Sequence, residues 1–217
     1  MRIVRIRHLF YPYMPRDYFY ELSSKQAEKG HEIHVITWGR ARENTIEKVS
    51  NKFFIHRLIG LNLVAGLSIE NYPYLINLNN TIKEINPDII HAESHLFLPS
   101  LQALMIAKKM HIPCVVSVHG VLADRGFFIN LLQKLYIHSI GLLVFKLANE
   151  VICLTSEDAS AITNLGVKPQ KISIVPNGVD TNLFKPNNDE YTPQVVWVGR
   201  FVPEKGVEYL IKAAEIV

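Results

Sequence analysis

Cysteine is scarce in this sequence, and neither sign of charge prevails. The two cysteines among 217 residues, Cys114 and Cys153, each lie inside an apolar run, where a reduced thiol is buried as a small hydrophobic side chain. Lys and Arg number 23 against 20 Asp and Glu, which gives a formal net charge of +3. The cysteines therefore indicate buried thiols, and the charge balance argues against a nucleic-acid partner, because proteins that bind nucleic acids usually carry a basic stripe.

Long apolar runs are missing as well. The most apolar stretch, residues 126–151, is interrupted by polar and charged residues before the roughly 20 apolar residues of a membrane-spanning helix accumulate. Arg5, Arg7 and Arg16 interrupt the first stretch, so it lacks the apolar core of a signal peptide. We therefore expect a cytoplasmic protein whose contact with a membrane, if it makes one, is peripheral.

Three common motifs are absent. The sequence has no G-x-S-x-G nucleophile elbow, no G-x-x-x-x-G-K-[ST] phosphate loop and no G-x-G-x-x-G fingerprint. Their absence argues against the usual hydrolase, nucleoside-triphosphatase and dinucleotide-binding classes.

Short β-branched runs alternate regularly with segments of helical length. The runs expected to be strands are 3–10, 32–37, 53–59, 88–91, 114–118, 151–154, 172–175 and 195–198. The segments expected to be helices are 17–29, 72–85, 96–110, 126–148, 156–165 and 204–217. This alternation predicts an α/β fold with a Rossmann-like parallel sheet and helices on both faces.

The composition changes near residue 176, where Pro, Asn and Gly become frequent, as is typical of linkers. We expect an N-terminal domain at 1–177, a linker at 178–193 and the first strand-helix unit of a second domain at 194–217. No later strand follows that unit, so we expect the second domain to be truncated.

Polar side chains follow several of the expected strands, at the carboxyl ends where open α/β sheets bind ligands. They include Arg16 after the first strand, His91 and Glu93 at the fourth, and His119, Asp124 and Arg125 after the fifth. The histidines suggest a metal, but their spacing is not that of ligands on one helix face and no cysteine joins them. We therefore favour structural or substrate-binding histidines and expect no metal.

The last strand-helix unit contains a second candidate site. Arg200 and Lys205 flank an expected helix start, and free N–H groups beside two cations would suit an anion such as a diphosphate. From the charges alone, a solvated helix start with Arg200 or Lys205 paired to Glu204 is an equal alternative.

The sequence resembles the family 4 retaining glycosyltransferases, which have the two-domain GT-B fold. The resemblance spans the chain and rests on these stretches: 10–12 (FYP), 29–37 (KGHEIHVIT), 87–93 (PDIIHAE), 118–120 (VHG), 175–180 (VPNGVD) with Phe184 and Pro186, and 198–200 (VGR) with 204–206 (EKG). The stretch 175–186 and the final pair are the most specific.

The resemblance implies transfer of a sugar, with retention of configuration, from a nucleotide sugar to an acceptor held by the N-terminal domain. Arg200 and Lys205 match the cations that hold the donor diphosphate, and His119 matches the histidine that reaches toward the donor sugar. Asn177 and Gly178 match the turn that leaves the first domain, and are expected to act as a hinge. The nucleotide sugar is a co-substrate, and no cofactor is implied.

The sequence departs from the family pattern in two places. Residues 14–17 (MPRD) stand where many members have a Gly-Gly pair close to the donor phosphates, and Pro15 lacks an N–H, so Arg16 is expected to supply a cation instead. The family's paired glutamates belong to a region that would begin beyond Val217. We therefore expect the chain alone to lack transferase activity.

Two other functions compete with this interpretation. One is a non-catalytic binding module or split subunit whose partner chain supplies the donor domain. The other is a different GT-B enzyme, such as a sugar-nucleotide epimerase, which the motifs at 175–180 and 199–206 disfavour. For the transferase, the acceptor would be a sugar or lipid-linked molecule. The apolar residues at 127–136, accompanied by Arg125 and Lys134, are candidates for contact with a membrane, and their packing on the sheet as an ordinary helix face is the favoured alternative.

Overall fold

The computed structural model describes residues 1–14, 16–62, 72–121, 127–186, 194–199, 201 and 205–216, with the backbone alone at 128 and 129. The chain divides into two compact units, Met1–Val179 and Asp180–Val217. All strands of the described residues belong to the first unit.

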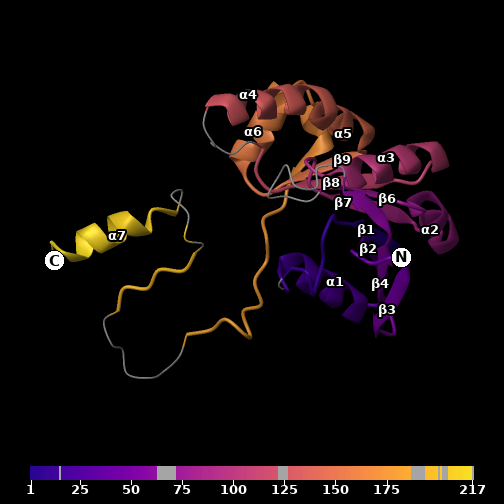
Figure 1. Ribbon diagram of the computed structural model, residues 1–217, viewed down its shortest axis with the longest axis horizontal. Coiled ribbons are helices and arrows are strands. Elements are labelled where there is room, and N and C mark those ends of the chain that lie inside the picture. Colours follow the sequence, from indigo (N-terminus) through magenta and orange to yellow (C-terminus); the bar gives the residue numbers. More distant parts are fainter. Residues whose placement is uncertain are drawn as a thin grey trace. The chain divides into compact units, whose positions relative to one another are not determined.

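The first unit is built on an eight-stranded sheet in the order β10-β9-β8-β7-β1-β2-β4-β3 (Figure 1). Its strands are β1 (Arg2–Ile6), β2 (Glu32–Trp38), β3 (Thr45–Ser50), β4 (Phe53–Leu58), β7 (Ile89–Glu93), β8 (Cys114–Val118), β9 (Glu150–Cys153) and β10 (Ile172–Ile174). All neighbours pair in parallel except β3 and β4, and a separate antiparallel pair joins β5 (Gly60–Asn62) to β6 (Pro73–Leu75). The predicted Rossmann-like parallel sheet is confirmed.

The strand order reverses at β1, which pairs with β2 on one side and β7 on the other. The chain therefore builds the sheet outward from β1 in two directions. The helices that follow β1 and β7 diverge at this point, and open α/β sheets bind ligands at the carboxyl ends of the strands there.

Helices connect most of the strands. They are α1 (Tyr18–Glu28), α2 (Leu78–Ile85), α3 (Leu98–Met110), α4 (Phe127–Tyr136), a π-helical turn (Ile137–Gly141), α5 (Leu142–Leu147), α6 (Ser156–Asn164), a 3-10 turn (Pro169–Lys171) and, in the second unit, α7 (Val207–Ala214). Asp17 caps α1, because its carboxylate accepts the N–H groups of Phe19 and Tyr20 at 3.1 and 3.3 Å. Gly30, with φ 96°, then takes the left-handed conformation that ends the helix.

Two hydrophobic clusters form the core, because alternate residues of β1 face opposite sides of the sheet. Val4 and Ile6 belong to the cluster that includes α2, α3 and α5. Ile3 belongs to the other cluster, where Phe19 and Tyr20 of α1 cover the sheet. Helix α1 thus covers one face by itself near β1, and its first residues lie at the carboxyl end of that strand.

The structure corrects some expected elements. Residues 195–198 are not a strand, because no described strand lies beside them to satisfy their backbone groups. Residues 72–85 are not one helix, since β6 pairs with β5 before α2 begins. The antiparallel strand β3 was not expected, because its exposed, charged sequence lacks an apolar run. Helix α7 is also shorter than the expected helix at 204–217.

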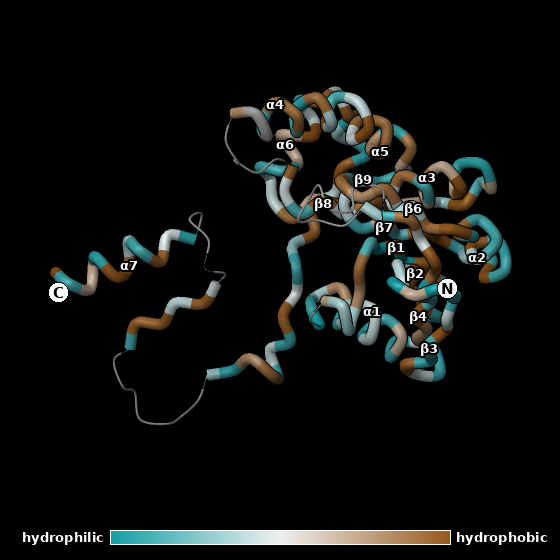
Figure 2. Tube along the Cα trace, in the orientation of Figure 1, coloured by the Kyte–Doolittle hydropathy of each residue, from teal (hydrophilic) through white to brown (hydrophobic). Residues whose placement is uncertain are grey.

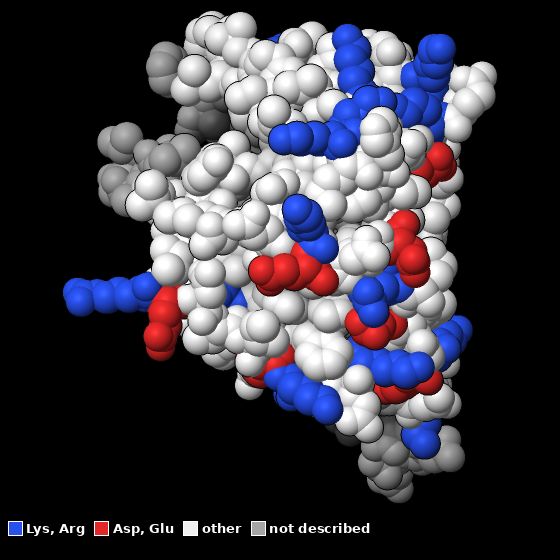
Figure 3. Space-filling view, turned by 90° about the vertical axis from the view of Figure 1, so that its right-hand side faces the viewer, with Lys and Arg blue, Asp and Glu red and all other residues white. Residues whose placement is uncertain are grey.

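Charges of both signs lie interspersed on the face of the molecule shown in Figure 3. In the first unit, Arg2 Nε lies 2.7 Å from Glu32 Oε1, and the same carboxylate contacts His34 Nε2 at 2.9 Å. Within the described ranges, no helix combines the length and the apolar character that crossing a bilayer requires.

Candidate functional site

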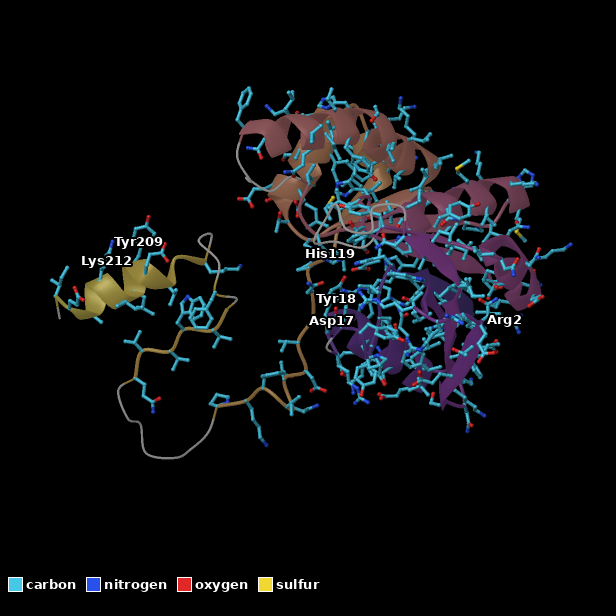
Figure 4. All side chains as sticks on the ribbon, viewed as in Figure 1. Arg2, Asp17, Tyr18, His119, Tyr209 and Lys212 are labelled. Atoms are coloured by element: carbon cyan, nitrogen blue, oxygen red, sulfur yellow. The ribbon has the colours of Figure 1, made fainter. Side chains whose placement is uncertain are left out.

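The carboxyl ends of β1, β7 and β8 bring three side chains together from distant parts of the sequence. Glu93 is the last residue of β7, His119 follows the last residue of β8, and Tyr18 is the first residue of α1. Figure 4 shows Tyr18 and His119 at the same edge, with Arg2, at the start of β1, far from them. We call Tyr18, Glu93 and His119 the Glu93 cluster.

Glu93 lies at the centre of this cluster. Its Oε1 atom accepts a hydrogen bond from the Tyr18 hydroxyl and lies 2.7 Å from Nε2 of His119. The Tyr18 hydroxyl also contacts the same imidazole nitrogen. The side chain of Glu93 is 5% exposed and that of His119 25%, so the carboxylate is enclosed while the imidazole reaches the surface.

The environment keeps Glu93 ionised and Tyr18 protonated. Burial raises the pKa of Glu93, but the hydrogen bond and charge of His119, together with the Tyr18 hydrogen bond, outweigh burial and hold that pKa below its ordinary value. Burial and the negative charge of Glu93 both raise the pKa of the Tyr18 hydroxyl. Tyr18 therefore acts as a donor and Glu93 as an acceptor at neutral pH.

This arrangement decides which nitrogen of His119 is offered to a ligand. A carboxylate accepts and never donates, so the proton between Glu93 and His119 belongs to Nε2 of the imidazole. The other nitrogen, Nδ1, is then an acceptor when the ring is neutral and a donor when it is charged. A ligand hydroxyl group, which can both donate and accept, would suit either state.

Two buried arginines lie behind the cluster. Arg5 is 1% exposed, lies 5.0 Å from the centre of the Phe19 ring and donates to Gln26 Oε1 at 2.6 Å. Burial lowers its pKa to about 10, while the charge of Glu93 acts to raise it. Arg7 forms an ion pair of 2.6 Å with Asp17, the cap of α1. The negative charge of Glu93 thus offsets a buried positive one.

Of the other residues predicted for the cleft, His91 lies two residues before Glu93 on β7 but makes its hydrogen bond outside this cluster. Its Nε2 atom is 2.6 Å from the Ser117 hydroxyl, and burial and the charge of Arg5 lower its pKa to about 3, so it is neutral. Asp124, Arg125 and Arg200 lie outside the described residues.

The predicted diphosphate-binding and hinge residues that the structure describes are not part of the Glu93 cluster. The guanidinium of Arg16 lies 5.0 and 4.8 Å from the ring centres of Tyr11 and Tyr20. Lys205 is exposed and belongs to the second unit. Asn177 and Gly178 are exposed in an irregular segment that follows β10.

Tyr18 is the site residue that the sequence did not reveal. The signal was its place directly after Asp17, at the start of the first helix and therefore at the carboxyl end of β1. Nothing in the sequence indicates that its hydroxyl meets Glu93, 75 residues away. Among the residues that the structure describes, no three His, Cys, Asp or Glu side chains gather as a metal site would require.

The chain is similar to known glycosyltransferases in sequence. It is 29% identical over 163 residues to the UDP-Gal:alpha-D-GlcNAc-diphosphoundecaprenol alpha-1,3-galactosyltransferase of Escherichia coli, an alignment that covers 69% of this chain and 41% of that protein. It is 24% identical over 217 residues to a phosphatidylinositol N-acetylglucosaminyltransferase subunit of Homo sapiens, covering 96% of this chain and 43% of the other. The chain thus spans less than half the length of these two relatives.

The fold is shared with a solved sucrose-phosphate synthase from Thermosynechococcus elongatus. The two superpose with a TM-score of 0.64 at 16% identity, over 100% of this chain and 60% of the other. A family model provides the decisive match, because it aligns with residues 17–183 and so contains all three members of the Glu93 cluster. This chain belongs to Glycosyltransferase Family 4.

Proposed function

We propose that this chain is the acceptor-binding part of a retaining glycosyltransferase that uses a nucleotide sugar as donor. The observation that carries the proposal is the Glu93 cluster, which lies at the carboxyl edge of a family 4 domain and orients His119 with no described residue bonded to Nδ1, so that this nitrogen can bind a hydroxyl of the donor sugar beside the acceptor. An enclosed carboxylate that orients a partly exposed imidazole suits a site that must hold a polar substrate in one position.

The reaction divides into roles that these residues can fill. The acceptor oxygen replaces the nucleoside diphosphate at the anomeric carbon, and the acceptor proton leaves with the diphosphate. His119 holds a hydroxyl of the donor sugar, while Arg200, Lys205 and Arg16 bind the diphosphate and stabilise its developing charge. His91, Glu93, Asp124 and Arg125 border the acceptor side.

We propose further that the acceptor carries a phosphate group. The names of the two relatives above specify a sugar linked to diphosphoundecaprenol and a phosphatidylinositol, both of which are phosphate esters of lipids. The buried and surface arginines near the carboxyl ends of β1 and β2 give this part of the chain the cations that such an acceptor needs.

We assign the donor half of the reaction to residues outside this chain, because the chain spans less than half the length of the two relatives above. Catalysis requires donor and acceptor to be held together, and the second unit, Asp180–Val217, contains one described helix. We therefore propose that a longer form of this protein, or a partner chain, supplies the rest of the donor-binding domain, with Asn177 and Gly178 as the hinge. The alternative is a non-catalytic binding module.

One experiment separates these functions. The protein, joined to or mixed with its donor-binding domain, is offered a panel of nucleotide sugars with polyprenyl diphosphate sugars, phosphatidylinositol or a polysaccharide. Mass spectrometry should detect one acceptor heavier by one sugar, and proton NMR should show the anomeric configuration of the donor preserved. Donor binding without product would favour the non-catalytic module, whereas conversion of the donor sugar without any acceptor would favour an epimerase.

We also propose that helix α4 touches the membrane that holds a lipid-linked acceptor. Apolar residues of this helix are exposed rather than packed on the sheet: Phe127 at 87%, Leu131 at 46%, Leu132 at 50% and Leu135 at 61%. In Figure 2, α4 shows hydrophobic positions interspersed with hydrophilic ones. Lys134, also exposed, provides a positive charge beside them. An apolar helix face with a basic residue suits the surface of an anionic bilayer.

Sedimentation with vesicles tests this contact. We expect the chain to co-sediment with vesicles containing anionic lipid, and Leu135→Glu to reduce the bound fraction several-fold, because a charge would enter the apolar face. Ile46→Glu, which adds the same charge at a residue 69% exposed on β3, is the control and should leave binding nearly unchanged. Equal loss in both variants, or no binding at low salt, would contradict the proposal.

A further inference from the structure

Arginine and aromatic side chains form a second cluster at the carboxyl ends of β1, β2 and β4. It consists of Arg40 and Trp38 at the end of β2, Arg57 near the end of β4, and Tyr11 and Tyr13 in the loop after β1. We call these five residues the Arg40 patch. None of them belongs to the Glu93 cluster, and only Tyr11, within the stretch 10–12 (FYP), contributed to the family resemblance.

Two aromatic rings hold Arg40 in place. Its guanidinium carbon lies 5.3 Å from the centre of the Tyr13 ring and 5.3 Å from that of Trp38. The Tyr13 hydroxyl donates to the carbonyl of Gly39 at 2.9 Å, which ties the ring to the backbone beside Arg40. The backbone of Arg40 has φ 52°, which is a left-handed conformation. This conformation is energetically unfavourable for residues other than glycine. The exposed guanidinium is thus positioned by its surroundings.

Arg57 lies beneath this surface and is 8% exposed. Its Nη2 atom donates to the Tyr11 carbonyl at 2.6 Å and to Glu47 Oε2 at 2.8 Å. Its Nη1 atom has no hydrogen-bond partner among the described residues, although the guanidinium lies 5.8 Å from the Tyr13 ring centre. A buried donor without a partner is costly, and a ligand that accepts from it would remove that cost.

The charges around the patch leave a positive excess. Glu47 offsets Arg57, whereas Arg40 forms no ion pair with any described residue. Arg42 and Glu43, both exposed on the following segment, offset one another in net charge. An arginine held on ring faces, next to a buried arginine with a spare donor, presents forked N–H groups that match the oxygens of a phosphate.

We propose that the Arg40 patch binds the phosphate or diphosphate group of the acceptor. The inference rests on the proposed function, since it assumes an acceptor on this unit. The patch and the Glu93 cluster lie at the same edge of one sheet, with the end of β1 between them, so an acceptor bound by its phosphate at Arg40 extends along that edge toward His119. A lipid headgroup and a soluble phosphate ester share this chemistry.

The fluorescence of Trp38 gives a direct test. The sequence contains two tryptophans, Trp38 and Trp197, so the Trp197→Phe chain reports on the patch alone. Inorganic pyrophosphate should change this fluorescence with saturation at submillimolar concentration, and Arg40→Gln should weaken the binding about tenfold. Arg42→Gln removes the same charge two residues away, where no ring contact holds the guanidinium, and should weaken it less than twofold.

Further arms identify the source of the phosphate. Binding of a soluble sugar 1-phosphate is compared with binding to phosphatidylcholine vesicles that do or do not contain phosphatidylinositol. Tighter binding to the vesicles with phosphatidylinositol would identify a lipid headgroup as the ligand, and tighter binding to the sugar 1-phosphate would identify a soluble ester. Arg40→Lys keeps the positive charge but lacks the forked N–H groups of the guanidinium, so it should bind pyrophosphate with intermediate affinity. This variant replaces Arg40→Gln in the test if Arg40→Gln does not fold. No saturation at several millimolar pyrophosphate, or equal losses in the Arg40 and Arg42 variants, would overturn the proposal.

This binding assay does not depend on sugar transfer. If the patch binds phosphate and no product forms with any donor, the phosphate site stands and the transferase proposal fails. If sugar transfer occurs while Arg40→Gln leaves both pyrophosphate binding and the acceptor KM unchanged, the acceptor phosphate is bound elsewhere.

Discussion

Replacing His119 by alanine is expected to lower kcat by about 100-fold in a protein that carries the donor-binding domain, because it removes the group that we propose binds the donor sugar. The imidazole is partly exposed, and Tyr18 still donates to Glu93 in its absence. We therefore expect the variant to lose far more activity than thermal stability, although Glu93 gives up one of its two hydrogen-bond partners. Steady-state kinetics with the identified donor measures kcat, and calorimetry on the same preparations measures the midpoint of thermal unfolding.

His138→Ala is the matched control for this variant. His138 is an exposed histidine in the π-helical turn, where Nδ1 contacts the carbonyl of Lys134 at 2.8 Å, and it lies outside the proposed site. Its removal should leave kcat within about twofold of the parent, as expected for a surface change away from the chemistry. If His119→Ala lowered the thermal midpoint and the activity in parallel, His119 would be a structural residue.

Replacing Glu93 by glutamine should reduce the free energy of unfolding by about 2 kcal/mol at pH 7, the loss expected when hydrogen bonds to a buried charged group are weakened. The amide keeps the size of the side chain but removes its negative charge. Tyr18 and His119 then lose a charged acceptor, and the buried guanidinium of Arg5 loses the charge that offsets its own. Urea denaturation measures the difference.

The difference in the free energy of unfolding between the parent and Glu93→Gln should become smaller as the pH falls. Because the pKa of Glu93 in the folded protein lies below its ordinary value of 4.5, the ionised carboxylate stabilises the fold fully above that value. As the pH falls below 4.5 and through the folded pKa, Glu93 takes up a proton and the stabilisation is lost. The gap between the parent and Glu93→Gln should therefore close under acidic conditions, and a gap independent of pH would contradict the assigned charge.

Two further measurements make the Glu93 prediction specific. Glu21→Gln, at an exposed position of α1, removes the same charge and should cost less than about 0.5 kcal/mol. The nitrogen NMR shifts of His119 should show the proton on Nε2 in the parent and a loss of that preference in Glu93→Gln. An unchanged proton position would mean that Glu93 stabilises the fold without orienting His119.

The sequence by itself determined the fold class and the family. β-branched runs alternating with amphipathic segments depend on local spacing, so they predicted seven strands of the main sheet, although β1 ends at Ile6 rather than Phe10. The same local rules failed where pairing with distant residues decides the outcome. The apolar run 195–198 has strand propensity but no described neighbour, while the polar segment 45–50 forms β3 because β4 offers it an edge.

Only the tertiary structure decided which polar residues act together. By strand position alone, His91, Glu93 and His119 were equal candidates, and only the family resemblance distinguished His119. His91 and Glu93 lie two residues apart on β7 and therefore on the same side of that strand, but His91 is hydrogen-bonded to Ser117, whereas Glu93, at the carboxyl end, contacts His119 and Tyr18. The Arg40 patch likewise joins β2, β4 and the loop after β1. Such contacts depend on strand register and side-chain direction, which arise from the packing of the whole sheet, whereas a single segment of sequence specifies its own periodicity and little more.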